Sequence, residues 1–112
     1  MSWTRKAHRA LHVMRYEDML ASPDETFGAL CMFLRLAPRP EELRQAVEKS
    51  SFERLRDMED ARGFTERPGA AARFFREGRA GSWKDHLTAP QIDAIVTNHR
   101  EQMERFGYWP LR

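Results

Sequence analysis

Several features common in other classes of protein are missing from this 112-residue chain. It has a single cysteine, Cys31, so it can form neither an internal disulfide nor a pair of metal-binding cysteines. Its longest hydrophobic run, FGALCMFL, is far too short to cross a bilayer, which takes about 20 residues. The N-terminus lacks the apolar segment of a signal peptide. These absences predict a cytoplasmic protein that does not interact with membranes.

An excess of charge of one sign is also missing. The chain has 19 Lys and Arg residues and 17 Asp and Glu residues, interspersed along its length, and its net charge is only +2. Nucleic-acid-binding proteins usually present a clustered basic face, so a small helical nucleic-acid-binding protein is the least favoured interpretation and no nucleic-acid partner is expected. The four histidines fit no metal-ligand spacing, so no metal site is predicted.

What the chain does contain is a series of amphipathic helices. Apolar residues at helical spacing predict helices over residues 23–35, 41–49, 51–62 and 89–106. Ser22 with Glu25 and Thr88 with Gln91 have the spacing of capping boxes, which satisfy the free N–H groups at a helix start. Gly107 is expected to end the last helix.

One segment, residues 10–16, is predicted to be a strand. Leu11, Val13 and Tyr16 are β-forming residues, and no Gly or Pro interrupts the segment. A single strand cannot satisfy its own backbone groups, and a strand followed by helices is typical of a parallel sheet covered by helices. We therefore expect the chain to be the tail of an α/β domain whose other strands lie outside it.

The remaining long segment, residues 64–87, is predicted to be a loop. It includes most of the run FFREGRAGSWKDHLT, which combines aromatic, basic and glycine residues with no sustained period. Such a run is too irregular for a helix face and too polar for a core strand. Long loops inside small domains are usually functional or disordered, so this loop is the first candidate for a ligand site.

Three segments carry a resemblance to a known family: VMRYEDMLASPDETFGALCMFL, EKSSFERLRDMEDARG and FFREGRAGSWKDHLTAPQ. In order and spacing they resemble the C-terminal half of cytosolic-type sulfotransferases, from about Trp3 to Tyr108. These enzymes transfer a sulfuryl group from 3′-phosphoadenosine 5′-phosphosulfate to an alcohol, phenol or amine. The resemblance implies a P-loop-like α/β parent fold with a parallel sheet. This chain would contribute mostly helices, one short N-terminal strand and the long ligand loop.

The resemblance also implies roles for residues of the loop. Arg76 and the backbone N–H of Gly78 match the positions that grip the 3′-phosphate of the donor. A guanidinium is suited to this because its N–H groups form a fork that fits phosphate oxygens, and glycine lets the backbone approach closely. Phe75 and Trp83 are expected to brace the loop.

Three further residues match positions that contact the adenine of the donor: Tyr16, Ser50 and Phe52. Each also has a plain structural alternative. Tyr16 fits ordinary sheet packing, Ser50 fits the N-cap of the helix over residues 51–62, and Phe52 fits the hydrophobic core.

Two residues depart from the family pattern. Glu77 stands where the family has a lysine, and a carboxylate about 4 Å from a phosphate would cost roughly 1 kcal/mol in water and about 4 kcal/mol at an effective dielectric of 20. We expect Glu77 to point outward while Arg73 or Arg79 supplies the lost positive charge. Ser82 replaces the loop aspartate, and we expect this to affect the bracing of the loop more than ligand contact.

The family's glycine-rich 5′-phosphosulfate loop and its catalytic histidine do not occur in these 112 residues. The resemblance therefore implies that the chain holds no catalytic residue, is inactive alone and needs an N-terminal half, covalent or separate. The alternative is a stand-alone, non-catalytic nucleotide-binding or interaction module that associates with itself through an exposed strand edge. Nothing in the sequence identifies the acceptor.

Overall fold

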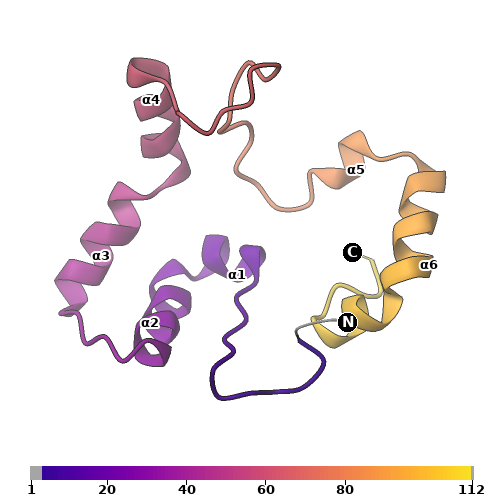
Figure 1. The fold of residues 1–112 in the computed structure, drawn as a ribbon, viewed down its shortest axis with the longest axis horizontal. Coiled ribbons are helices and arrows are strands. Elements are labelled where there is room, and N and C mark those ends of the chain that lie inside the picture. Colours follow the sequence, from indigo (N-terminus) through magenta and orange to yellow (C-terminus); the bar gives the residue numbers. More distant parts are fainter. Residues whose placement is uncertain (1–3, 112) are drawn as a thin grey trace. The chain divides into compact units, whose positions relative to one another are not determined.

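Helices are the only regular elements in residues 4–111, the part of the chain that the computed structural model describes (Figure 1). They are α1 (Tyr16–Ala21), α2 (Pro23–Phe33), α3 (Pro40–Lys49), α4 (Phe52–Arg62), α5 (Trp83–His86) and α6 (Ala89–Arg105). The chain falls into two units, of which the first ends at Ala80 and the second begins at Gly81.

The predicted strand over residues 10–16 is wrong. Residues 11–15 form no regular element, although the backbone of Arg15 is extended (φ −95°, ψ 139°), and Tyr16 begins helix α1. The physical reason is that a strand exists only through hydrogen bonds to a neighbouring strand, and no segment between residues 4 and 111 supplies one. The strand edge that was expected to mediate self-association is therefore not formed in this part of the chain.

Helices α2, α3, α4 and α6 lie within two residues of their predicted bounds. The capping box predicted for Ser22 and Glu25 is wrong, because the Ser22 side chain makes no capping hydrogen bond. The start of α2 is instead connected to α1, since the Thr26 hydroxyl donates to the carbonyl oxygen of Asp18 at 3.0 Å.

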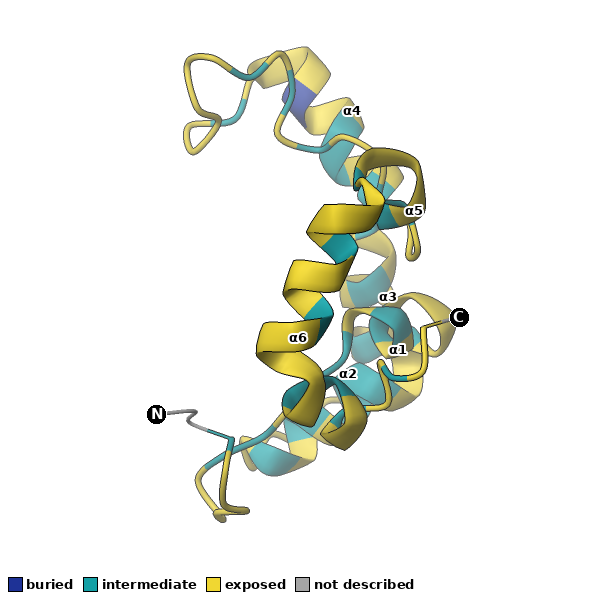
Figure 2. Cartoon of the chain, turned by 90° about the vertical axis from the view of Figure 1, so that its right-hand side faces the viewer, coloured by how far each residue is buried: buried dark blue, intermediate teal, exposed yellow. Residues whose placement is uncertain are grey.

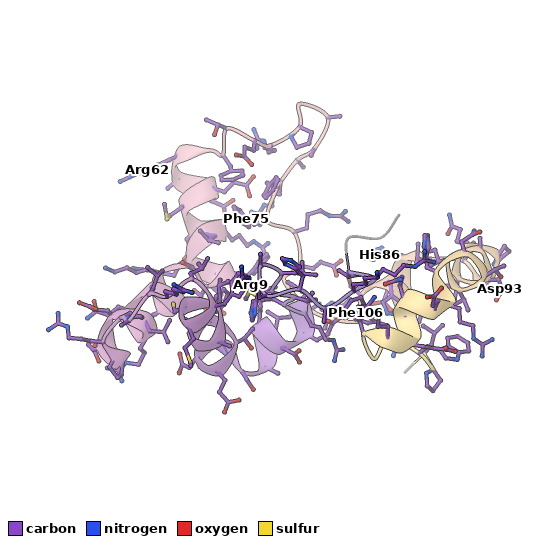
Figure 3. The ribbon with its side chains drawn as sticks, turned by 60° about the horizontal axis from the view of Figure 1, so that its bottom comes forward. Arg9, Arg62, Phe75, His86, Asp93 and Phe106 are labelled. Atoms are coloured by element: carbon purple, nitrogen blue, oxygen red, sulfur yellow. The ribbon has the colours of Figure 1, made fainter. Side chains whose placement is uncertain are left out.

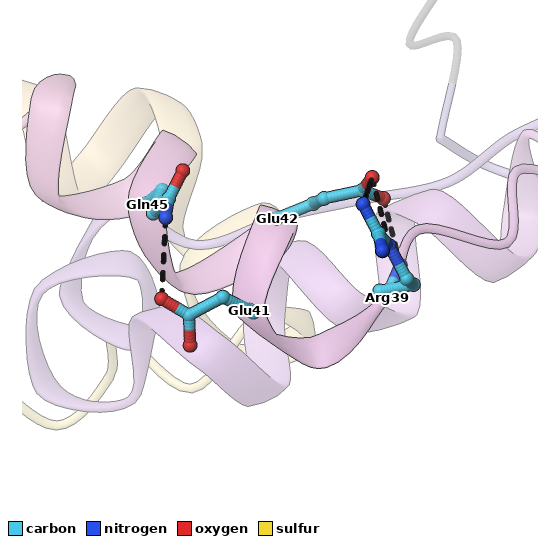
Figure 4. Close-up of polar contacts among 4 residues, drawn as sticks. All are labelled: Arg39, Glu41, Glu42 and Gln45. Carbon is cyan, nitrogen blue, oxygen red and sulfur yellow. Dashed lines mark hydrogen bonds and ion pairs between the residues drawn. The ribbon is translucent and has the colours of Figure 1, made fainter.

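Helix α3 begins with a local cluster of polar contacts (Figure 4). Glu42 accepts the backbone N–H of Arg39 at 2.9 Å and its guanidinium at 2.8 Å. The backbone hydrogen bond, followed by the side-chain bond, lowers the pKa of the Glu42 carboxyl. Gln45 donates to Glu41 at 3.2 Å on the next turn. Carboxylates in the first turn of a helix satisfy free N–H groups and oppose the helix dipole, so these contacts fix where α3 starts.

Residues 4–80 of the first unit enclose no hydrophobic core. Helix α2 contacts α1 and α3, and α3 contacts α4, yet no hydrophobic side chain of the described residues is buried. In Figure 2 the ribbon is teal or yellow, the colours of intermediate and exposed residues, apart from one buried position in dark blue, which is Glu59 on α4. Helices normally bury their apolar stripes against a second layer, so the apolar faces of this unit are open for further packing.

The second unit contains α5 and α6. Helix α5 forms inside residues 64–87, so the prediction of an unbroken loop is wrong there. The Thr88–Gln91 cap is formed, with the Thr88 N–H donating to Gln91 at 2.9 Å. Gly107 follows the end of α6 and has a positive φ of 75°. The N–H of the next residue, Tyr108, donates a hydrogen bond to a carbonyl oxygen in the last turns of the helix. No helix within residues 4–111 is both long enough and apolar enough to cross a membrane.

Candidate functional site

The first unit carries a pocket of about 730 Å³, a size typical of small-molecule sites. Helices α1 to α4 and the segment after α4 all contribute to its lining. Its floor is apolar and includes Leu20, Phe27, Leu30, Leu43, Val47 and Leu55. Among the described residues in the lining, Arg76 is the one charged side chain. An apolar lining with a single charged side chain favours a ligand that has an apolar part and a charged part.

Six of the seven residues predicted from the sequence line this pocket: Tyr16, Ser50, Phe52, Phe75, Arg76 and Gly78. They come from three stretches of the chain: the start of α1, the α3–α4 junction and the segment after α4. The seventh, Trp83, belongs to the second unit, where it is the first residue of α5 and its ring lies 5.7 Å from the Lys84 ammonium. The bracing role of Trp83 stays a prediction.

Two of the three structural alternatives for the adenine-contact residues, those for Tyr16 and Ser50, do not describe this structure. Tyr16 is 44% exposed at the start of a helix, not packed in a sheet. Ser50 is the C-cap that follows α3, and Ser51 is the residue that caps α4, by accepting the Arg54 N–H at 3.4 Å. Phe52 is partly exposed and lines the pocket.

Gly78 and Phe52 meet directly. A Cβ atom on Gly78 would lie 2.3 Å from Cγ of Phe52, and Gly78 has a φ of +63°, which favours glycine. The expected reason for this glycine was the close approach of the backbone to a ligand. The structure adds a second reason, which is that the ring of Phe52 fills the space a side chain would need.

An aromatic cluster extends from Phe52 into the segment after α4. Ring centroids lie 6.4 Å apart for Phe52 and Phe75, and 5.1 Å apart for Phe64 and Phe75. Phe64 also lies 4.6 Å from Phe74. Edge and tilted contacts of this kind stabilise the packing of a loop beyond the area buried. In Figure 3, Phe75 lies beside α4, at the foot of the loop.

Glu59 is the residue of this region that the sequence analysis missed. Its carboxylate accepts the backbone N–H of Phe74 at 2.7 Å and that of Phe75 at 2.9 Å. The sequence held one signal for it, because Glu59 follows Phe52 and Leu55 at the i, i+3, i+7 spacing of an apolar helix face. A carboxylate on such a face requires hydrogen-bond partners.

The charged groups around Arg76 are paired in a way that the sequence did not reveal. Glu77 forms an ion pair with Arg79 at 3.2 Å, and Arg73 pairs with Asp60 at 3.1 Å. Both arginines that were expected to replace the family lysine thus have carboxylate partners. The pairing also neutralises Glu77, so Arg76 supplies the positive charge of the pocket lining.

The chemistry of the lining fits an aromatic base that carries a phosphate. Tyr16 and Phe52 offer ring surfaces, Ser50 offers a hydroxyl, and Arg76 offers a guanidinium. No group of three or more His, Cys, Asp or Glu side chains that could hold a metal ion occurs among residues 4–111.

Comparison with known proteins identifies similar chains. The family model for the sulfotransferase domain matches residues 1–107. The chain is 32% identical over 102 residues to a 3-alpha-hydroxysteroid sulfotransferase of Cavia porcellus and 29% identical over 97 residues to sulfotransferase 2A1 of Macaca fascicularis. These alignments cover 88% and 81% of this chain but 34% and 33% of the relatives, so the chain spans about a third of their length. No solved structure matches it significantly.

Proposed function

Because the chain belongs to the sulfotransferase domain family, we propose that it is the C-terminal portion of a sulfotransferase and binds the adenosine 3′-phosphate end of the sulfate donor. Sulfotransferases of this family use 3′-phosphoadenosine 5′-phosphosulfate as donor and have a P-loop-like α/β domain. This chain contributes helices and a ligand loop to that domain.

The observation that supports the proposal most is that six of the seven residues to which the resemblance assigned site roles line one pocket. Phe52 and Tyr16 offer the adenine its ring contacts, and Ser50 offers a hydrogen bond. Arg76 and the backbone at Gly78 take the 3′-phosphate. The pairing of Glu77 with Arg79 removes the electrostatic objection to a phosphate beside Arg76, because the carboxylate already has a counter-charge.

In the proposed reaction, the acceptor oxygen or nitrogen attacks the sulfur atom of the donor. A new bond to sulfur forms while the bond from sulfur to the 5′-phosphate oxygen breaks, and adenosine 3′,5′-bisphosphate leaves. This chain holds the leaving nucleotide and positions it. The proton of the acceptor passes to a base outside these 112 residues, so we expect the chain to be inactive alone.

The partner we propose is the N-terminal portion of a sulfotransferase domain, in the same polypeptide or in a separate one. The apolar floor of the pocket and the lack of buried hydrophobic side chains in the described residues support a second layer that covers them. The mass of the native polypeptide in its source cells tests this. A mass well above 13.2 kDa, or a stable complex with a second chain, is expected. A stable monomer of 13.2 kDa would contradict it. The cytoplasm stays the predicted compartment.

Calorimetric titration with two nucleotides tests the binding site itself. Adenosine 3′,5′-bisphosphate should bind about tenfold or more tightly than adenosine 5′-phosphate, because a charge-assisted hydrogen bond to the 3′-phosphate contributes roughly 1.5–3 kcal/mol. The variant Arg76→Ala should bind both nucleotides equally.

The matched control is Arg62→Ala, which removes the same charge from the last residue of α4. Figure 3 shows the Arg62 side chain extending away from Phe75, so this variant should keep the preference of the wild type. Equal affinity of the wild type for both nucleotides, or no binding up to about 1 mM, would overturn the proposal.

A further inference from the structure

Glu59 is the one charged residue that is buried among the described residues, with a relative exposure of 5%. Its two carboxylate oxygens accept two successive backbone N–H groups, Oε1 from Phe74 and Oε2 from Phe75. The hydrogen bonds join residues 15 and 16 positions apart, so they connect the body of α4 to the middle of the segment over residues 64–87. A carboxylate that accepts backbone N–H bonds makes stronger hydrogen bonds than a neutral acceptor does.

The place of these bonds in the chain matters for the pocket. Phe75 directly precedes Arg76, and Gly78 follows two residues later. Fixing the main chain at Phe74 and Phe75 limits where the Arg76 guanidinium can reach. The second fixed point is Gly78, whose Cα lies against the ring of Phe52 at the start of α4. Arg76 therefore lies between two attachments to the same helix.

We propose that Glu59 is a positioning residue, which fixes the loop on α4 and thereby sets the place of Arg76 at the rim of the pocket. The part concerning Arg76 and its ligand rests on the proposed function. The part concerning the loop rests on hydrogen bonds that can be measured without any ligand. Nothing in the proposal requires Glu59 to contact substrate or donor.

The charged side chains near Glu59 that bear on its carboxylate lie on the loop and on α4. Arg67 and Arg73 of the loop attract its carboxylate, and Asp60 of α4 is paired with Arg73. The hydrogen bond from Phe74 is the largest cause that lowers the pKa of Glu59 below 4.5; burial opposes it, and the Phe75 bond and the two arginines add to the lowering.

The lowered pKa of Glu59 determines how the attachment of the loop to α4 depends on pH. A carboxylate with a lowered folded-state pKa stabilises the attached state fully above its ordinary pKa of 4.5. The attachment of the loop should therefore be complete at neutral pH. It should weaken as the pH falls below 4.5 and be lost once the pH passes the lowered pKa.

The first test measures the loop directly, by NMR of the Phe74 and Phe75 amides in the full chain. In Glu59→Gln the amide group keeps only one acceptor oxygen, so one of the two N–H groups loses its partner. Hydrogen-exchange protection of these amides should fall about tenfold or more. Glu53→Gln, the same change at an exposed position of α4, should leave it unchanged. Helix content by circular dichroism shows whether each variant folds.

A pH titration of the wild type needs no variant. The Phe74 and Phe75 amide resonances should shift together with a pKa below 4.5, and the shift should be absent in Glu59→Gln. Amide resonances that do not follow a carboxylate, or protection that survives in Glu59→Gln, would overturn the inference.

The second test measures nucleotide preference, and it separates this inference from the proposed function. Glu59→Gln should reduce the preference for adenosine 3′,5′-bisphosphate over adenosine 5′-phosphate about tenfold, while Glu53→Gln keeps it. If the wild type shows no preference, the proposed function fails and the amide measurements still decide the attachment. If the wild type shows the preference and Glu59→Gln retains it despite a released loop, the positioning role is wrong.

Discussion

The segment that follows α4 has two parts that are held in different ways. The distal part, residues 65–72, makes local contacts: the Ala71 N–H donates to Pro68, and the Arg67 guanidinium donates to the Ala72 carbonyl at 3.1 Å. The attached part, residues 74–78, is joined to α4 by Glu59 and by the ring of Phe52. The distal part is stabilised by contacts between residues that are close in sequence. The attached part is stabilised by contacts to α4.

Of these two parts, the attached part is the one that contains predicted ligand residues. Phe75, Arg76 and Gly78 line the pocket, whereas no residue of the distal part does. Residues that hold a ligand must be kept in place by a rigid element, and contacts to a helix of 11 residues provide this. The difference predicts that substitutions in the attached part cost more, both in loop stability and in binding, than substitutions in the distal part.

The largest effect is expected for Gly78→Ala. The new Cβ would overlap the Phe52 ring, and alanine is strained at a φ of +63°. Together these should destabilise the attached part by about 2–4 kcal/mol, and hydrogen exchange of its amides measures the change. Nucleotide binding should weaken in parallel.

Gly69→Ala is the matched control in the distal part. No atom lies within 4 Å of a Cβ built at Gly69, and its φ is not in the left-handed range. Its effect should stay within about 0.5 kcal/mol. Equal effects of the two substitutions would show that the two parts of the loop are held alike.

An intermediate effect is expected for Gly63→Ala, at the point where the loop leaves α4. Gly63 has a φ of 74° and a ψ of 177°, a region open almost only to glycine, but no atom stands near its Cβ position. The cost is therefore backbone strain alone, about 1–3 kcal/mol. Exchange of the last amides of α4 and of the Phe74 amide measures it. A larger cost than that of Gly78→Ala would mean that Phe52 contributes nothing to holding the loop.

The contrast between local contacts and contacts to a segment far away in sequence also explains which parts of the fold could be predicted from the sequence. Helix α6 follows from signals within a few residues, namely the Thr88–Gln91 cap and the stop at Gly107. The strand at residues 10–16 failed because its formation depends on partners that the local pattern does not contain. Its β-forming residues describe a preference, and the described part of the chain offers no neighbouring strand to realise it.

The residues of the site could be predicted where a sequence motif identifies them, as at Arg76 and Gly78. They were harder to predict where their role depends on packing between distant segments. The resemblance named six residues that the structure brings to one pocket. It did not identify Glu59, whose role depends on a hydrogen bond across 15 positions. It also did not predict the ion pair of Glu77 with Arg79, because Arg79 was expected only as one of two arginines that could replace the family lysine. Such pairings depend on how the loop folds back, and spacing alone does not fix that.

The smallest effect is expected for Arg67→Ala in the distal part. The substitution removes an exposed hydrogen bond to the Ala72 carbonyl and one of the two positive charges that attract Glu59. An exposed contact of this kind contributes at most about 0.5 kcal/mol, so loop protection should barely change. The pKa of Glu59 should rise slightly but stay below 4.5, because the Phe74 hydrogen bond that lowers it most is kept. An NMR titration of the Phe74 amide measures this pKa. A return to the ordinary value would mean that the charges of the distal part, and not the backbone N–H groups, hold Glu59 ionised, and the distinction between the two parts would then fail.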